Sequence, residues 1–401
     1  MHSDVAFASD NSKRVVDSDE GLADLIRRSR TEGVVAVDTE FVWERTFFPQ
    51  LGLVQLGFRD SEPELIDVPA LSSLAPLGGL LADPDVVKLF HDAGQDLTIL
   101  YRETGSLPRN VVDTQLAAGF AGFTATLSLQ DLLQETVDIA LKKTETRTNW
   151  LQRPLSEAQA AYALDDVRYL VAAYEHLLER LESYGRIDWM RDEMRVFENA
   201  EFYADLDITD LARKVKGVSI GRLSSREVLL LQGLAAWRES EARTRDLPRR
   251  RVLDDAAISE ILRRKPTSTE ELKRLRALDD RTAGRHGTAI ARVVQDALEA
   301  LDKHLPARPK QAPVRDDAFA ARARLAQAFI AGRALGAGVD PTLVATRAET
   351  EEFVAAVDDG MDRGALDLGW RAEFAGRDLG RLLEGSLKIG VNGQGLPDTS
   401  E

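Results

Sequence analysis

The sequence predicts an α/β domain, a mixed sheet with helices on its faces, followed by two all-α domains. Three short β-rich runs come early in the chain, at residues 34–39, 51–58 and 64–68, and a buried apolar run follows at 86–91. Three strands in succession, then strands alternating with helices, are typical of a mixed sheet covered by helices. Beyond residue 184 no stretch has a convincing strand pattern, so the remainder is expected to be helical.

The helices and boundaries follow from apolar spacing, capping residues and Pro- or Gly-rich breaks. A helix is expected from residue 96, and a long one over 156–182, with Ser156 as its N-cap just after Pro154. The predicted segments are a flexible N-terminus (1–20), the α/β domain with a helical connection (21–215), a helical domain (222–303), a Pro-rich charged linker (304–317), a second helical domain (318–386) and a disordered tail (387–401).

Composition narrows the class of protein. The 401 residues are 44% hydrophobic and 30% charged, as in soluble globular proteins of several domains. No apolar run is long enough to span a bilayer, and the first residues lack the pattern of a secretory signal, so a cytoplasmic protein without membrane contact is expected. With no cysteine and only five histidines, disulfides and Cys-based zinc sites are excluded and a zinc hydrolase is disfavoured.

Net charge by itself decides little about a nucleic-acid partner. The formal charge is −15, but residues 222–276 hold 14 Lys and Arg against 9 Asp and Glu, a local +5. Patches rather than totals determine the electrostatic attraction to a polyanion.

Three acidic patches are the candidate site. Asp38 and Glu40 are two apart on a predicted strand and so share a face, and Tyr162 and Asp166 are four apart on a predicted helix and so point the same way. Asp96 lies near the start of another helix. Each patch alone has a simpler structural interpretation. Asp38 and Glu40 would be a solvated strand end, Tyr162 and Asp166 a core tyrosine beside an exposed acid, and Asp96 an acid that compensates a helix dipole. Together they can converge on divalent cations.

The local contexts of these patches resemble a known family. DTEF, HDAGQDL and YALDD are similar to the three exonuclease motifs of the DEDD superfamily, in its tyrosine subclass. The blocks FFPQLGLVQLGF and KTETRTNWLQRPLS resemble those of the ribonuclease D family, so that the likeness covers residues 20–215. The segment LAAWRESEARTRDLPRRRV resembles an HRDC domain, and the last helical segment is similar to the second, weaker HRDC-like repeat of that family.

The resemblance implies a ribonuclease H-like exonuclease domain that uses two divalent cations, Mg²⁺ or Mn²⁺. Asp38 would bridge both cations, Glu40 and Asp166 would complete the one that holds the attacking water, and Asp96 would support the other. Tyr162 would orient the water rather than act as a full base, since a phenol has a pKa of about 10.

Contacts with substrate are implied less directly. By the resemblance or by their place, residues expected near the terminal nucleotides are Phe41, Gln55, His91, Lys143, Trp150 and Arg153. Structural alternatives stay open, with Trp150 as a core anchor, Arg153 paired with an acid, and His91 and Gln55 in structural hydrogen bonds. A nucleic-acid patch is expected at Arg249, Arg250, Arg251, Arg263, Arg264 and Lys265.

The expected function is a monomeric 3′–5′ exoribonuclease that releases 5′-mononucleotides from RNA 3′ ends, such as those of tRNA precursors. One alternative is a DNA 3′–5′ exonuclease of the proofreading or Werner type, because helicases that act on DNA also carry HRDC domains. Another is a catalytically idle RNA-binding adaptor, which the complete set of acidic residues disfavours.

Overall fold

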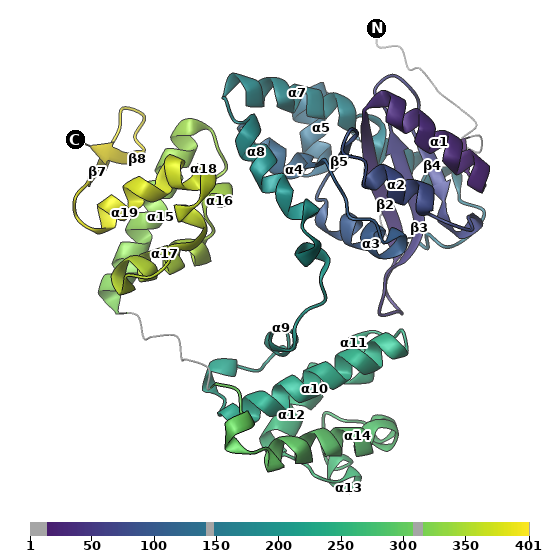
Figure 1. Ribbon diagram of the computed structural model, residues 1–401, viewed down its shortest axis with the longest axis vertical. Helices are drawn as coiled ribbons and strands as arrows, with labels where there is room; N and C mark the ends of the chain where they lie inside the picture. The colour runs from purple at the N-terminus through teal and green to yellow at the C-terminus, as the bar shows by residue number, and fades with distance from the viewer. Residues whose placement is uncertain (1–13, 142–147, 308–315, 401) are drawn as a thin grey trace. The chain divides into compact units, whose positions relative to one another are not determined.

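The computed structural model describes residues 14–141, 148–307 and 316–400. The chain forms two compact units (Figure 1). Unit 1 comprises Met1–Phe41, Leu51–Tyr203 and Asp316–Glu401, and unit 2 comprises Val42–Gln50 and Ala204–Arg315. In the described residues, no helix combines the length and the apolar character that crossing a membrane requires.

Unit 1 is built on a mixed sheet with the strand order β1-β4-β3-β2-β5-β6. β3 and β4 are antiparallel, whereas β1 runs parallel to β4 and β5 runs parallel to both β2 and β6. The four predicted strands are present, and the two that were missed, β1 and β6, are too short to show a pattern. The strands are β1 (Val15–Val16), β2 (Val34–Val42), β3 (Gln50–Gly57), β4 (Glu64–Asp67), β5 (Val87–Phe90) and β6 (Val111–Asp113).

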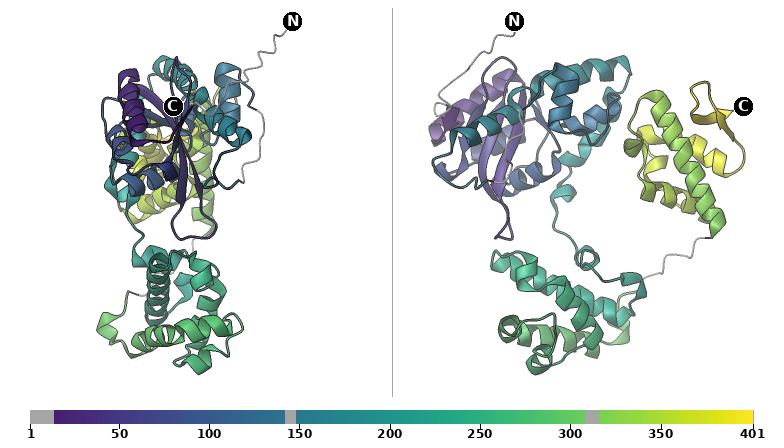
Figure 2. Two further views of the ribbon diagram at one scale, coloured as in Figure 1. Left: turned by 90° about the vertical axis from the view of Figure 1, so that its right-hand side faces the viewer. Right: turned by 180° about the vertical axis from the view of Figure 1, so that it is seen from behind.

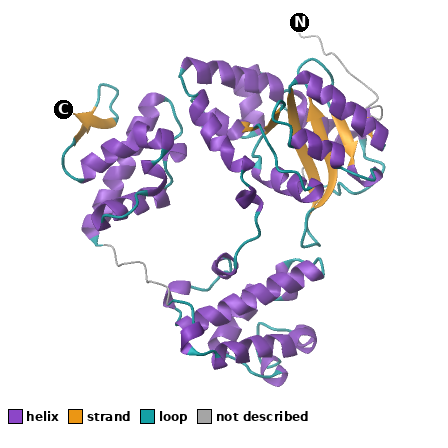
Figure 3. Ribbon diagram, in the orientation of Figure 1, coloured by secondary structure: helices purple, strands orange, loops and turns teal. Residues whose placement is uncertain are grey.

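Helices cover the sheet (Figures 2 and 3). Ser156 caps the predicted long helix in a capping box with Gln159, but Tyr169, at φ −111° and ψ 0°, divides it into two helices. The helices that precede the connection to unit 2 are α1 (Asp19–Glu32), α2 (Ala75–Leu81), α3 (Gly94–Thr104), α4 (Thr114–Phe120), α5 (Leu129–Val137), α6 (Glu157–Arg168), α7 (Leu170–Ser183) and α8 (Ile187–Met194).

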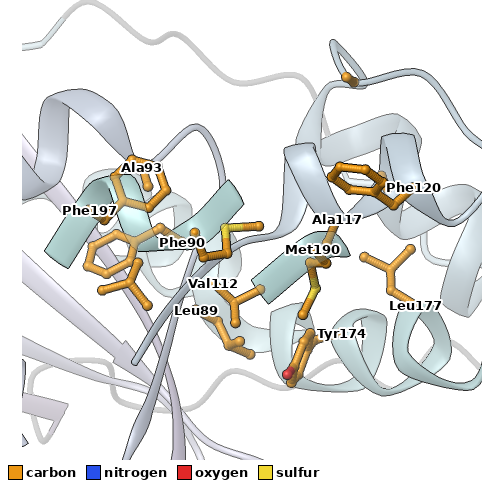
Figure 4. Close-up of a cluster of buried hydrophobic side chains, with 14 of the residues drawn as sticks. Leu89, Phe90, Ala93, Val112, Ala117, Phe120, Tyr174, Leu177, Met190 and Phe197 are labelled. Carbon is orange, nitrogen blue, oxygen red and sulfur yellow. The ribbon is translucent and has the colours of Figure 1, made fainter. Parts of the chain in front are cut away.

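The hydrophobic core of unit 1 shows which side chains of β2 lie on which face of the sheet. Val35 and Val37 are buried in one cluster with Leu25 of α1, Leu80 of α2 and Leu97 of α3. Side chains alternate across a strand, so the even-numbered residues 38 and 40 point to the other face. Figure 4 shows the part of this core in which β5 and β6 meet α4, α7 and α8, and in which Leu89, Val112 and Met190 are buried in one cluster.

The N-terminal segment is ordered earlier than expected. Flexibility was predicted for residues 1–20, but Val15 and Val16 pair with Leu65 and Ile66 of β4. Ser18 then caps α1 by accepting a hydrogen bond from Gly21 N. The prediction was wrong for residues 14–20, because a two-residue strand gains its stability from a distant partner. Residues 1–13 lie outside the described part of the chain.

The last helices of the chain cluster with unit 1 rather than standing apart. Trp370 stacks on Trp189 of α8 at 4.9 Å between ring centroids, and Arg371 Nη2 donates to Glu193 Oε2 at 2.8 Å. Asp340 accepts from Ala125 N at 2.7 Å. These helices are α15 (Asp317–Ala337), α16 (Pro341–Val344), α17 (Arg347–Asp359), α18 (Gly369–Arg371) and α19 (Arg377–Leu383).

The predicted disordered tail is a β-hairpin. β7 (Lys388–Val391) pairs antiparallel with β8 (Pro397–Ser400). Asn392 Oδ1 accepts from the backbone N–H groups of Gln394 and Leu396, and Gly395 has a φ of +77°. The Gly and polar residues that suggested disorder therefore form the turn. The hairpin lies directly on α15, because a Cβ at Gly332 would come within 2.1 Å of Pro397 O.

Unit 2 is helical and has its own hydrophobic core. Ala212 and Val215 belong to that core, so residues 204–215 fold with unit 2 and not with the α/β domain as predicted. Part of the predicted linker, residues 308–315, lies outside the described residues. The helices are α9 (Ile208–Arg213), α10 (Ser225–Thr244), α11 (Arg249–Val252), α12 (Asp255–Arg264), α13 (Thr269–Leu272) and α14 (Asp280–Glu299).

The loop between β2 and β3 also belongs to unit 2. Phe47 is buried with Ala242 and Val252. Asp246 Oδ1 accepts hydrogen bonds from Phe47 N at 2.9 Å and Phe48 N at 3.1 Å. The strand that carries Asp38 and Glu40 therefore continues into a segment that folds with the other unit, which the sequence did not indicate.

Candidate active site

Three carboxylates from two elements converge in unit 1. Asp38 and Glu40 lie on one face of β2, which extends to Val42, beyond its predicted end. Asp166 comes from α6. Each of the three offers one carboxylate oxygen, and these oxygens all lie within 4.8 Å of one another. The i, i+2 spacing on a strand thus meets a helix on the same side of the sheet, as the sequence predicted.

A glycine allows α6 to lie close against the sheet. A Cβ added to Gly57 of β3 would come within 2.2 Å of Val167 O, the carbonyl of the residue that follows Asp166. A side chain at this position would push the helix away from the strand. Gly57 therefore sets the short distance between the strand and helix carboxylates.

Asp96 approaches from the first turn of α3 and is buried. Thr39, the residue between Asp38 and Glu40, donates its hydroxyl to Asp96 Oδ1. Asp96 is not one of the three tightly grouped ligands. Its expected role of supporting the second cation stays a prediction.

The turn that leads into α3 is held by a residue the sequence did not single out. Asp113, the N-cap of α4, accepts hydrogen bonds from Asp92 N at 3.1 Å and Ala93 N at 3.0 Å. Asp92 has a φ of +64°, an uncommon backbone conformation for a residue with a side chain. Thr39 acts through Asp96, and Asp113 acts through the turn that leads into α3. Of the two, only Asp113 had a signal in the sequence, which was its helix-capping position.

Burial and mutual repulsion raise the pKa values of the acidic residues. Burial is the main cause, and it raises the pKa of Glu40 to about 8 and those of Asp96 and Asp166 to about 7. The pKa of Asp38 lies well above its ordinary value because of burial and then the charges of Asp96, Asp166 and Glu40. Ionising the whole cluster is therefore costly unless a cation compensates.

This donor set fits divalent cations. Clustered carboxylate oxygens are the hard ligands that Mg²⁺ and Mn²⁺ prefer, and a bound cation offsets the repulsion among them. The short spacing of the three carboxylate oxygens and the raised pKa of Asp38 both indicate a place where a cation would offset the repulsion among the carboxylates. The cluster is therefore suited to hold divalent metal.

Tyr162 completes the group as predicted from its i, i+4 spacing. Its hydroxyl hydrogen-bonds to Asp166. Burial, followed by the charges of Asp166, Glu40 and Asp38, raises the pKa of the phenol above its ordinary value. The group therefore stays protonated at neutral pH, which favours orientation of a water over its deprotonation.

Trp150 and Arg153 have structural partners. Trp150 is buried, and its carbonyl would lie 2.4 Å from a Cβ at Gly52. Arg153 Nη2 donates to Asp67 Oδ1 at 2.7 Å and to Gly52 O at 2.9 Å, and its Nε also donates to the Asp67 carboxylate. These contacts favour the structural alternatives that the sequence left open, in which Trp150 anchors the core and Arg153 pairs with an acid.

The other predicted substrate contacts have different outcomes. The side chain of Gln55 is fully buried and, within the described residues, makes no hydrogen bond, so the structure supports neither its expected place near the terminal nucleotides nor the alternative of a structural hydrogen bond. Both ring nitrogens of His91 are engaged, by Thr114 Oγ1 and Leu127 O at 2.9 Å each. Phe41 is half-buried against the core of unit 1, and its contact with the terminal nucleotides stays a prediction. Lys143 lies outside the described residues.

The predicted nucleic-acid patch divides into paired and unpaired cations. Arg249 pairs with Glu239, Arg264 with Glu260 at 3.1 Å, and Lys265 with Glu227 at 3.0 Å. Arg263 is 4.0 Å from the same Glu260. The guanidinium groups of Arg250 and Arg251 form no ion pair with any described residue and are exposed, which leaves these two freest to meet a phosphate.

Comparison with known proteins identifies the family. A family model for 3′–5′ exonucleases matches residues 13–182, and a model for the HRDC domain matches residues 229–294. A ribonuclease D from Desulfotalea psychrophila is 37% identical over 363 residues, which is 90% of this chain and 96% of that protein. The chain belongs to the ribonuclease D family. A second ribonuclease D, from Granulibacter bethesdensis, is 34% identical and covers 96% of this chain and 95% of its own length.

The fold agrees with that assignment. The crystal structure of Escherichia coli RNase D, an exoribonuclease involved in structured RNA processing, matches with a TM-score of 0.81 at 29% identity, over 92% of this chain and 98% of that one. The chain is a 3′–5′ exoribonuclease with an RNA substrate. The comparisons favour neither the DNA exonuclease nor the idle adaptor.

Proposed function

We propose that the chain removes nucleotides one at a time from RNA with a free 3′ end and releases 5′-mononucleotides. The observation that carries the proposal is the convergence of three carboxylate oxygens within 4.8 Å beside a tyrosine hydroxyl. Two divalent cations, Mg²⁺ or Mn²⁺, would be held there by Asp38, Glu40, Asp166 and Asp96.

Bound cations would lower the pKa of an attacking water and stabilise the leaving oxygen. The chain's own residues have separate tasks. Asp38, Glu40 and Asp166 hold their carboxylates at fixed positions on a strand and a helix, so little reorganisation is needed during the reaction. The protonated hydroxyl of Tyr162 orients the attacking water from the side of Asp166. Thr39 keeps Asp96 turned toward the cluster.

The physiological substrates proposed are precursors of tRNA and other stable RNAs, processed at their 3′ ends in the cytoplasm by a monomer. Support for a structured RNA substrate comes from the likeness to the Escherichia coli enzyme, which is involved in structured RNA processing. Sedimentation of the full chain across a range of concentrations tests the monomer, which a concentration-dependent increase in mass would contradict.

Degradation of matched RNA and DNA oligonucleotides tests the activity. A 5′-labelled RNA should shorten as a ladder from its 3′ end with Mg²⁺ or Mn²⁺, release 5′-mononucleotides and stop in EDTA. A tRNA precursor with a 3′ extension should be trimmed in the same way. Asp38→Asn should abolish cleavage while RNA binding persists. Equal degradation of DNA, or internal fragments without a ladder, would contradict the proposal.

A further inference from the structure

Unit 2 contains a cationic pocket of about 700 Å³ that the catalytic cluster does not use. Its walls come from two segments far apart in the sequence, the loop after β2 and the start of α11. The side chains that matter here are those of Trp43, Arg45, Arg250 and Arg251. Glu44 is also in the lining, so arginines outnumber carboxylates there.

The pocket is held in shape by contacts beneath it. Trp43 Nε1 donates to Phe47 O at 2.8 Å, which fixes the indole relative to its own loop. The buried Phe47 ring lies under the Arg249 guanidinium, 4.7 Å from its centroid, and Arg249 also pairs with Glu239. Arg249 is therefore part of the wall and not a free cation.

The remaining groups are available to a ligand. The side chains of Arg45, Arg250 and Arg251 are exposed and form no ion pair with the described residues. Trp43 is 47% exposed although it is a large apolar ring. A guanidinium offers a planar fork of donors that matches phosphate, and an exposed indole offers a face on which an unstacked base can lie. The same combination suits duplex RNA poorly, because its bases are already stacked.

We propose that this pocket, formed by Trp43, Arg45, Arg250 and Arg251, binds a nucleotide of single-stranded RNA upstream of the 3′ end. The base stacks on Trp43 and the arginines bind the backbone phosphates. The inference rests on the proposed RNA substrate and adds a second point of attachment for it. Trp43 follows Glu40 by three residues, which an extended chain spans in about 10 Å at most. RNA only a few nucleotides longer than the cleaved end can therefore reach the pocket.

The test compares a long and a short substrate on the full chain. For wild type, Trp43→Ala and the double variant Arg250→Gln/Arg251→Gln, kcat/KM is measured on a 12-nucleotide RNA and on a dinucleotide. The ratio of the two values should fall about 10-fold in both variants, mainly through KM for the long RNA. Trp43→Phe keeps an aromatic face and should restore most of the ratio.

Salt dependence gives an independent readout. In an Asp38→Asn background, the slope of log affinity for the 12-nucleotide RNA against log salt should become shallower by about 1.4 when two phosphate contacts are removed from a single strand. The matched control is Arg274→Gln/Arg276→Gln, which removes two exposed arginines of the same unit that do not line the pocket. Its ratio and its salt slope should equal those of wild type.

Three outcomes would overturn the pocket. An unchanged ratio in Trp43→Ala and the arginine variant excludes binding there, and parallel losses on both substrates show structural damage instead. If the control Arg274→Gln/Arg276→Gln has the same salt slope as Arg250→Gln/Arg251→Gln, the arginines only attract RNA to unit 2 in general and form no specific pocket. Failure of the proposed function is distinct, because wild type itself would then degrade neither RNA.

Discussion

Without divalent cation, the protein should lose stability as the pH rises from about 5 to 8. The metal-free fold holds the pKa values of Asp96 and Asp166 at about 7 and that of Glu40 at about 8. An unfolded chain has carboxyl pKa values of about 3.9 to 4.3. Because the folded values are the higher ones, the folded state binds more protons in this range, and stability is greatest at low pH and falls as the pH rises.

The magnitude follows from the number of protons retained. Each extra proton on the folded state lowers the free energy of unfolding by about 1.4 kcal/mol per pH unit, so one proton retained from pH 5 to pH 7 amounts to about 2.7 kcal/mol. For a unit of more than 200 residues, this corresponds to a decrease in Tm of roughly 5 to 10 °C. Divalent cation should reverse most of the decrease, since it binds the ionised cluster and not the unfolded chain.

Thermal unfolding at pH 5, 6, 7 and 8, in EDTA and in excess Mg²⁺, measures this linkage. Asp38→Asn removes a carboxyl group whose raised pKa keeps it protonated in the metal-free fold, so it should flatten the pH dependence in EDTA while abolishing the effect of Mg²⁺. Asp165→Asn is the comparison variant: Asp165 is half exposed and pairs with Arg168, and its charge contributes less than burial to the raised pKa of Asp166, so the slope should change less than in Asp38→Asn. A wild-type Tm in EDTA that stays constant or rises from pH 5 to 7 would refute the reasoning. So would identical slopes for wild type and Asp38→Asn.

Three further substitutions have defined expectations. Arg153→Ala should lower the free energy of unfolding by about 2 to 4 kcal/mol in urea titrations, because Asp67 keeps a largely buried charge without its partner. Tyr162→Phe should lower kcat about 100-fold with little change in KM, since only the water-orienting hydroxyl is lost. Glu193→Ala should increase hydrogen exchange in α15–α19, because Arg371 and the Trp370 indole N–H both lose their acceptor.

Each of these has a contrasting result. Arg59→Ala breaks a pair whose side chains are largely exposed and should change stability by less than about 1 kcal/mol, so an equal loss would remove the argument from burial. A full-rate Tyr162→Phe enzyme would exclude the water-orienting role. Unchanged exchange in Glu193→Ala would show that α15–α19 do not depend on this contact with α8.

Local periodicity explains why the site itself was predictable. Glu40 lies two residues beyond Asp38 on a strand, and Asp166 lies four beyond Tyr162 on a helix, so each pair shares a face whatever the rest of the fold does. The predicted strands had buried apolar patterns and appeared as expected. By contrast, the two-residue β1 and the hairpin at 388–400 depend on distant partners, and their sequences read locally as flexible.

The sequence by itself determined the family, the mixed sheet and the pairing of acidic residues on shared faces, because these depend on short-range spacing and local motifs. Only the tertiary structure decided which polar groups were already engaged. The sequence left Arg153 open between a contact near the terminal nucleotides and a pair with an acid, and only the structure shows its partner Asp67, 86 residues away. The same is true of Phe47 and Asp246, whose hydrogen bond lies within unit 2 although the two residues are 199 apart in the sequence. The sequence does not show which partner a charged or aromatic side chain has. Long-range packing determines whether that side chain stabilises the fold or remains available to bind RNA.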